Sequence, residues 1–132
     1  LIGFPEVSIG IIPGAGGTQR LPKVIGLSNA KYWIYTAKKF NSKESLDYGF
    51  LNFISTKSDL LNKGMELAND ILLNAPIAVK SSKKSINDGY NSNINDGLAI
   101  ERLNYNISLN TKDRDEALEA FLNKRKPNWS NE

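Results

Sequence analysis

Glu6 is the first residue whose type and setting could support acid/base chemistry. It follows Phe4 and Pro5 and precedes a largely apolar run at residues 7–12. A carboxyl group beside apolar neighbours can be partly buried, and such a group is suited to proton transfer. On the residues alone, a surface glutamate at the edge of a loop is the more common explanation. Glu6 is therefore a candidate catalytic residue that needs a second observation.

A glycine cluster follows Glu6 and could approach a ligand closely. The cluster contains Pro13, Gly14, Gly16 and Gly17. It is not a phosphate-binding P-loop, because no Lys-Ser/Thr pair follows at the required spacing. It is not a dinucleotide fingerprint, because Gln19 occupies the place of the third glycine. Glycines of this kind permit a close backbone approach or present free amides at a helix N-terminus, and a tight turn packed on the core is the alternative.

A short basic stretch near the end of the chain is the third candidate. It reads Lys124-Arg125-Lys126 and ends an expected helix that carries Phe121. Lys and Arg side chains bind phosphate. Basic residues at a helix C-terminus also complement the helix dipole or simply face solvent, and these alternatives stay open here.

Composition excludes several classes of chemistry. The chain has 132 residues, 40% of them hydrophobic and 23% charged, and a net charge of +3. Without cysteine or histidine it can form no disulfide, thiolate metal site or Ser-His triad, so acid/base chemistry falls to Asp, Glu, Lys or Tyr. The sequence contains no run of about 18 apolar residues, the length that would predict a membrane span. The first residues lack the basic segment of a targeting peptide.

The periodicity predicts a mixed first third and a helical remainder. Residues 7–12 are expected to form a short buried strand or a loop packed under one, and residues 50–54 are strand-like. Two such runs cannot form a stable sheet alone. Either partner strands precede residue 1 or the chain is a piece of a larger domain. Helices are expected at 18–24, 29–37, 41–49, 59–73, 76–88, 95–109 and 111–122. The tail, residues 124–132, is expected to end loosely.

The order of motifs resembles the enoyl-CoA hydratase/isomerase (crotonase) superfamily. Residues 4–22 read FPEVSIGIIPGAGGTQRLP, which is similar to the signature stretch of that family. Later landmarks occur in the same order, as LDYGFL at 46–51, APIA at 75–78, GLAIE at 97–101, TKDRDEA at 111–117 and AFLNKRKP at 120–127. The resemblance spans the whole chain. Among branches it looks most like methylglutaconyl-CoA hydratase and short-chain enoyl-CoA hydratase.

This resemblance implies an α/β fold, the C-terminal part of a ClpP/crotonase-like ββα spiral, mostly helical in this stretch. Residues 1–57 would end the spiral core with its active-site turn, and residues 58–132 would form a helical trimerisation region. The family's N-terminal half supplies oxyanion-hole donors and the first catalytic glutamate, and these motifs are not found here. The chain is therefore expected to be a C-terminal fragment, inactive when isolated.

The resemblance also assigns roles to the candidate residues. Glu6 matches the second catalytic glutamate, which exchanges a proton with the α-carbon of an enoyl-CoA thioester. Pro13, Gly14, Gly16 and Gly17 match the turn that lines the acyl pocket. Phe121 and Lys124 match residues that reach coenzyme A, which is part of the substrate. No metal ion and no other cofactor is implied.

The resemblance leaves several functions open. The expected reaction is reversible syn addition of water to a trans-2-enoyl-CoA. An isomerase or another crotonase reaction on the same enolate is the first alternative. A non-catalytic RNA-binding or structural role is the second, supported only by a pI near 9 and the absent active-site half. A homotrimer or dimer of trimers is expected, with mitochondrial location implied by resemblance alone and a cytoplasmic location otherwise.

Overall fold

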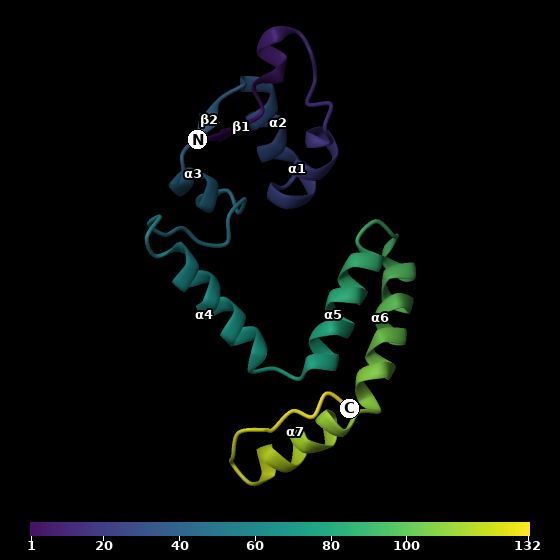
Figure 1. Cartoon of the computed structure of the whole chain (residues 1–132). Coiled ribbons are helices and arrows are strands. Elements are labelled where there is room, and N and C mark those ends of the chain that lie inside the picture. The colour runs from purple at the N-terminus through teal and green to yellow at the C-terminus, as the bar shows by residue number, and fades with distance from the viewer. The chain divides into compact units, whose positions relative to one another are not determined.

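A computed structural model describes residues 1–132 as two compact units, Leu1–Leu60 and Leu61–Glu132. Figure 1 shows a mixed N-terminal unit and a helical C-terminal one. None of the helices is long and apolar enough to cross a bilayer.

The first unit combines short helices with one small antiparallel sheet. Strand β1 pairs with strand β2, and Ile2 lies opposite Phe40. Both strands were absent from the elements expected from the sequence, because two residues are too few to show an alternating pattern. The elements are β1 (Ile2–Gly3), the 3-10 helix η1 (Pro5–Ile9), α1 (Gly17–Ile25), α2 (Leu27–Thr36), β2 (Lys39–Phe40) and α3 (Ser42–Asp47).

The strands expected at residues 7–12 and 50–54 are not present. Residues 5–9 form η1 instead, because Pro5 suits the first helical position and the Ser8 hydroxyl donates to the Pro5 carbonyl at 2.7 Å. Gly10 then ends η1 with a positive φ of 81°. At residues 50–54 no neighbouring strand is present to pair with, and the Phe50 N–H donates to the Ser45 carbonyl at 2.9 Å.

A capping box starts α3, as its sequence predicted. The Glu44 N–H donates to the Asn41 side-chain oxygen at 2.9 Å, and the Asn41 N–H donates to the Glu44 carboxylate at 2.8 Å. Each side chain satisfies a backbone donor that the helix leaves free. This contact fixes the chain direction immediately after β2.

An aromatic cluster forms the core of the first unit. Trp33 is fully buried, and its ring stacks on Phe40 with centroids 4.2 Å apart. Tyr48 meets Trp33 edge to face at 5.4 Å. Buried Leu21 and Ile25 from α1 belong to the same cluster. The cluster therefore joins α1, α2, β2 and the end of α3.

Four helices form most of the second unit, and all four were expected. They are α4 (Leu60–Leu72), α5 (Pro76–Gly89), α6 (Ile94–Leu109) and α7 (Lys112–Leu122). Pro76 occupies the first turn of α5. The side chains of Asn93 and Thr111 cap α6 and α7 by accepting backbone N–H groups at 3.1 Å.

Helices α5 and α6 pack against each other as a hairpin, the two green helices of Figure 1. Small residues permit their close approach where the chain turns, since a Cβ on Gly89 would lie 3.6 Å from the Gly97 Cα. Helix α4 has no buried residue. Its large apolar side chains are exposed within this unit, with Leu61 at 76% and Leu72 at 73%.

The C-terminal tail is anchored rather than loose, which corrects the sequence expectation. Asp113 is 1% exposed, and its carboxylate accepts N–H groups from Ser130 at 2.7 Å and Asn131 at 3.2 Å. The Trp129 indole N–H donates to the Leu73 carbonyl at 2.9 Å. The polar composition of the tail predicts a solvated end. Its contacts could not be predicted from the sequence, because the partners of the tail are distant along the chain.

Candidate functional site

A pocket of about 310 Å3 in the first unit contains Glu6 and is otherwise mostly apolar. It collects residues from η1, the glycine-rich turn, α1 and the segment after α3. Glu6 is the one carboxylate that lines it. The lining residues are Phe4, Glu6, Pro13, Ala15, Gly17, Arg20, Leu21, Val24 and Phe50.

The Glu6 carboxylate has a buried oxygen without a partner. Its Oε2 is shielded from solvent and accepts no hydrogen bond. An unsatisfied buried oxygen costs free energy, so such a group is rare in structural positions and calls for an explanation. Glu6 lies in the first turn of η1, directly after Phe4 and Pro5. This observation favours a catalytic or ligand-binding role over a surface glutamate.

The glycine-rich turn divides into residues that line this pocket and residues that do not. Pro13 and Gly17 are buried and line it together with Glu6. A Cβ on Gly17 would lie 2.8 Å from both the Phe4 ring and the Pro13 Cβ, so only glycine permits this packing. Gly14 and Gly16 do not line the pocket.

Gly16 instead shapes the start of α1. It is the N-cap residue with a φ of 90°, a left-handed conformation that favours glycine. The Arg20 guanidinium lies against it, 2.8 Å from where a Cβ would be. Arg20 also donates to the Ala15 carbonyl. The turn is therefore a packed support for the pocket wall, which was the alternative weighed from the sequence.

Phe121 and Lys124 lie in the second unit, at the end of α7. The Phe121 ring is 82% exposed. Lys124 is exposed and has a left-handed backbone with a φ of 52°. The Lys124 amine takes part in no hydrogen bond or ion pair. Both side chains are therefore accessible within their own unit.

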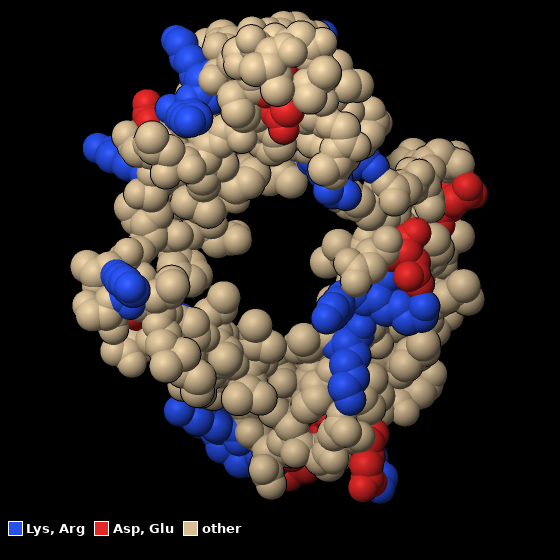
Figure 2. Space-filling model, turned by 45° about the horizontal axis from the view of Figure 1, so that its top comes forward, with Lys and Arg blue, Asp and Glu red and all other residues tan.

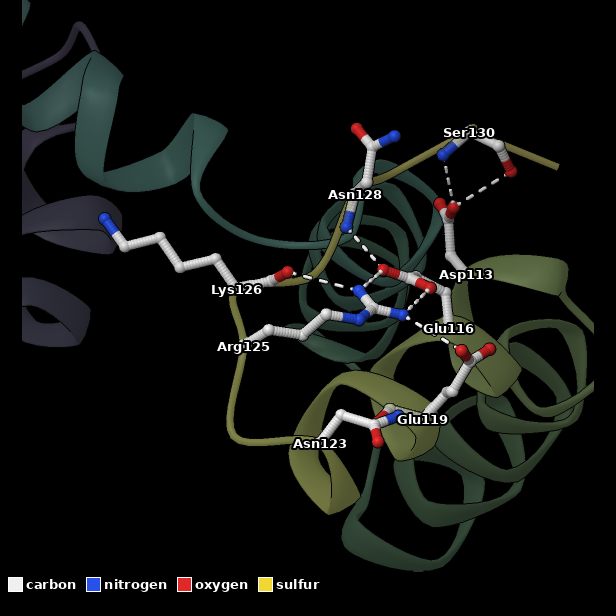
Figure 3. A network of polar contacts seen from close by, with 8 residues as sticks. All are labelled: Asp113, Glu116, Glu119, Asn123, Arg125, Lys126, Asn128 and Ser130. Carbon is white, nitrogen blue, oxygen red and sulfur yellow. Dashed lines mark hydrogen bonds and ion pairs between the residues drawn. The ribbon is translucent and has the colours of Figure 1, made fainter.

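Arg125 differs from its two lysine neighbours because its charge is neutralised. Its guanidinium donates to both oxygens of Glu116, at 2.5 and 2.9 Å, and lies 3.3 Å from Glu119 (Figure 3). The Asn128 N–H also donates to the Glu116 carboxylate, at 2.7 Å. Because the hydrogen bonds from Arg125 and then the bond from Asn128 favour the charged carboxylate, the pKa of Glu116 is lowered from 4.5 to about 2. Within Lys124-Arg125-Lys126, the arginine is thus a structural residue.

Several pocket residues were not singled out from the sequence. Arg20, Leu21 and Val24 recur at helical spacing and share one face of α1, a pattern that periodicity could have shown. Phe50 reaches the pocket from a distant part of the chain, and no local signal indicates it. No three Asp or Glu side chains lie together in a way that could hold a metal ion.

Comparisons with known proteins place this chain in a family. The model of the enoyl-CoA hydratase/isomerase family matches residues 1–132. A short-chain-enoyl-CoA hydratase from Clostridium acetobutylicum is 44% identical over 94% of this chain and 48% of its own length. Human mitochondrial methylglutaconyl-CoA hydratase is 38% identical over 99% of this chain and 40% of its own length.

A solved structure shares the fold. The enoyl-CoA hydratase from Bacillus anthracis superposes with a TM-score of 0.86 at 41% identity, covering 97% of this chain and 50% of that one. The expected fold, part of a crotonase fold with mostly helical content, is confirmed. The chain spans about half the length of the relatives it matches.

Replacing Gly17 tests the close packing behind the pocket. Gly17→Ala is expected to destabilise the protein by about 1–3 kcal/mol, because the added methyl group overlaps the Phe4 ring and Pro13. Urea unfolding of the native protein measures this change. Gly14→Ala is the matched control, since its Cβ would meet only the Ile12 carbonyl at 3.9 Å. Equal stability of the two variants would contradict the packing argument.

Acid titration tests the Glu116–Arg125 pair. The folded-state pKa of Glu116, about 2, lies below its ordinary value of 4.5. The pair therefore stabilises the folded state above pH 4.5, and this contribution is lost as the pH falls from 4.5 toward 2. Melting temperatures of the native protein and Glu116→Gln are expected to differ at pH 5 and to converge toward pH 2. A gap that stays constant would exclude the pair as its cause.

Proposed function

The chain belongs to the enoyl-CoA hydratase/isomerase family, and on this premise we propose that it is part of an enoyl-CoA hydratase. The proposed reaction is reversible syn addition of water to a trans-2-enoyl-CoA thioester. The observation that carries the proposal is the Glu6 carboxylate, with its unpartnered buried Oε2 in a mostly apolar pocket. No metal or redox cofactor takes part in this proposal.

Glu6 is proposed to exchange a proton with the α-carbon of the substrate. During hydration, water adds to the β-carbon, and negative charge develops on the thioester oxygen as an enolate. The α-carbon then takes a proton from the Glu6 carboxyl group. An apolar pocket that excludes water strengthens the electrostatic interactions of this step. Pro13 and Gly17 would form the pocket wall beside the acyl chain.

The reaction also needs a base for the water and donors for the enolate oxygen. Glu6 is the one carboxylate of its pocket. We propose that a second glutamate and the oxyanion-hole donors come from outside residues 1–132. This chain then corresponds to the C-terminal part of the family's fold, with residues 1–57 ending the core and residues 58–132 forming the assembly region.

Phe121 and Lys124 are proposed to contact the CoA portion of the substrate. CoA carries phosphate groups, and the exposed Lys124 amine has no internal partner, so their charges are complementary. The flat, exposed Phe121 ring offers a surface on which an adenine can stack. In crotonases such contacts can be made to the substrate of a neighbouring subunit, which fits the proposed oligomer.

An enoyl-CoA isomerase is the second candidate function. The family description includes both reactions, and each could pass through the same enolate with Glu6 moving a proton at carbon. Assays with 2-enoyl-CoA and 3-enoyl-CoA separate the two. An RNA-binding role is supported only by the pI near 9, and Figure 2 shows acidic side chains as well as Lys and Arg on the face that it presents. Mitochondrial location, with a cytoplasmic location as the alternative, stays a prediction from resemblance.

Glu6→Gln in the native protein tests the proposed catalytic role. The amide keeps the size of the side chain but cannot exchange a proton at neutral pH, so kcat is expected to fall about 10²–10⁴-fold with little change in KM. Steady-state hydration of crotonyl-CoA measures both constants. Asp47→Asn, an exposed change in α3, is the control. Near-normal kcat in folded Glu6→Gln would refute the assignment.

The isolated chain provides a second test. Residues 1–132 alone are expected to show negligible hydration of crotonyl-CoA, because removing oxyanion donors costs about 10²–10³ in rate and removing an acid/base group costs about 10²–10⁴. Loss of the enoyl-thioester absorbance measures the rate. Robust turnover by this chain alone would show that the complete active site lies within it.

The assembly of the native protein provides a third test. Helix α4 carries exposed Leu61, Met65 and Leu72 and buries none of its residues within the second unit. Apolar faces of this kind are normally covered by a partner. We propose a homotrimer or a dimer of trimers with the helices of residues 58–132 at the interface. Sedimentation that finds a stable monomer at micromolar concentration would contradict this proposal.

A further inference from the structure

Lys124 occupies a position at the end of α7 where glycine is favoured. The Arg125 N–H donates to the Ala120 carbonyl at 3.0 Å, and the Lys124 N–H donates to the Phe121 carbonyl at 3.2 Å. These two bonds form a Schellman motif, in which the penultimate residue is left-handed and usually glycine. Lys124 has a φ of 52°. A side chain there costs free energy that glycine would not.

The following residues hold this strained turn closed. Arg125 binds Glu116 with both ends of its guanidinium and also meets Glu119. Glu116 accepts a third bond from the Asn128 N–H at 2.7 Å. Farther along, the buried Asp113 carboxylate accepts from Ser130 (Figure 3). The backbone on the C-terminal side of Lys124 is therefore fixed to α7 at two points.

In the basic stretch Lys124-Arg125-Lys126, the positive charges without a carboxylate partner are those of the two lysines. The guanidinium of Arg125 is neutralised by two carboxylates, whereas the Lys124 amine is exposed and makes no ion pair. A strained backbone at a functional position is commonly maintained by the contacts around it. The turn at Lys124 has such a strained backbone, because the lysine is left-handed, and it has such contacts, because the Arg125–Glu116 ion pair holds the residues that follow it.

We propose that the Arg125–Glu116 pair is a positioning device, which holds the left-handed turn so that the Lys124 amine meets a phosphate of CoA. The proposal deepens the function proposed above and rests on it. Glu116 and Arg125 do not touch the substrate. They act through the direction in which Lys124 leaves the end of α7.

Two variants of the native protein test this device. Lys124→Gly removes the amine and suits the left-handed backbone, so it is expected to raise the melting temperature while raising KM for crotonyl-CoA about threefold to tenfold. Glu116→Gln keeps Lys124 but weakens the clamp, so it is expected to raise the same KM in the same range and to lower the melting temperature. Lys126→Gln removes an equal charge from the same segment and is the control.

Crotonyl-pantetheine distinguishes positioning from general damage, because this thioester lacks the phosphates of CoA. Glu116→Gln is expected to leave the kcat and KM for crotonyl-pantetheine unchanged, because Glu116 does not touch the substrate and acts only through the position of the Lys124 amine. An unchanged KM for crotonyl-CoA in Lys124→Gly would overturn the proposal. So would equal KM increases for both thioesters in Glu116→Gln.

Calorimetry with CoA itself separates this inference from the proposed reaction. If the native protein hydrates neither thioester but binds CoA, and Lys124→Gly weakens that binding threefold or more, the positioning device stands and the hydratase proposal fails. If Lys124→Gly and Lys126→Gln weaken CoA binding equally, the effect is one of net charge and the positioning device is excluded. Lys124→Gly is expected to be more stable than the native protein. If Glu116→Gln fails to fold, CoA binding by Lys124→Gly and Lys126→Gln therefore still tests the proposal.

Discussion

The stack of Trp33 on Phe40 is the contact on which the geometry of the first unit depends. Phe40 lies in β2, and β2 holds β1 by pairing with Ile2. The chain then passes directly from β1 into η1, where Glu6 lies in the first turn. The strand that leads into the Glu6 turn is thus held by an aromatic contact whose two rings lie about thirty residues away in sequence. Steric fit at Gly17 completes the arrangement by allowing the turn to approach the start of η1.

The second unit is organised differently, by polar contacts rather than by a large apolar core. Its buried residues include Asn104 and Asp113, and each has hydrogen-bond partners. Carboxylates on α7 accept hydrogen bonds from backbone N–H groups of the tail. Most of the large apolar side chains stay exposed within the unit. Polar contacts can fix the ends of helices, but they bury little apolar surface. Apolar surface left exposed in this way is the kind that a partner surface normally covers.

Local signals predicted much of this structure, and distant contacts account for the rest. The Asn41 and Thr111 caps and the first turn at Pro76 were readable because each acts within four residues. The run at 7–12 was expected to be a strand or a packed loop, and its first residues instead belong to the 3-10 helix η1, because β-branched residues favour strands only where a neighbouring strand exists. For the site, Glu6 was a candidate from its apolar neighbours, but the pocket that it lines also includes Phe50, which the fold brings from a distant part of the chain. The arginine clamp on Glu116 spans nine residues across a helix end, beyond the reach of a periodic pattern.

The two indole rings divide between the two units and differ in their surroundings. Trp33 is fully buried among aromatic rings, and its N–H has no acceptor. Trp129 is partly exposed, and its N–H donates to the Leu73 carbonyl. The chain has no other tryptophan. Emission from the buried, unbonded Trp33 indole is expected at shorter wavelength than emission from the partly exposed, hydrogen-bonded Trp129 indole. One emission spectrum can therefore follow the aromatic core and the release of the tail separately.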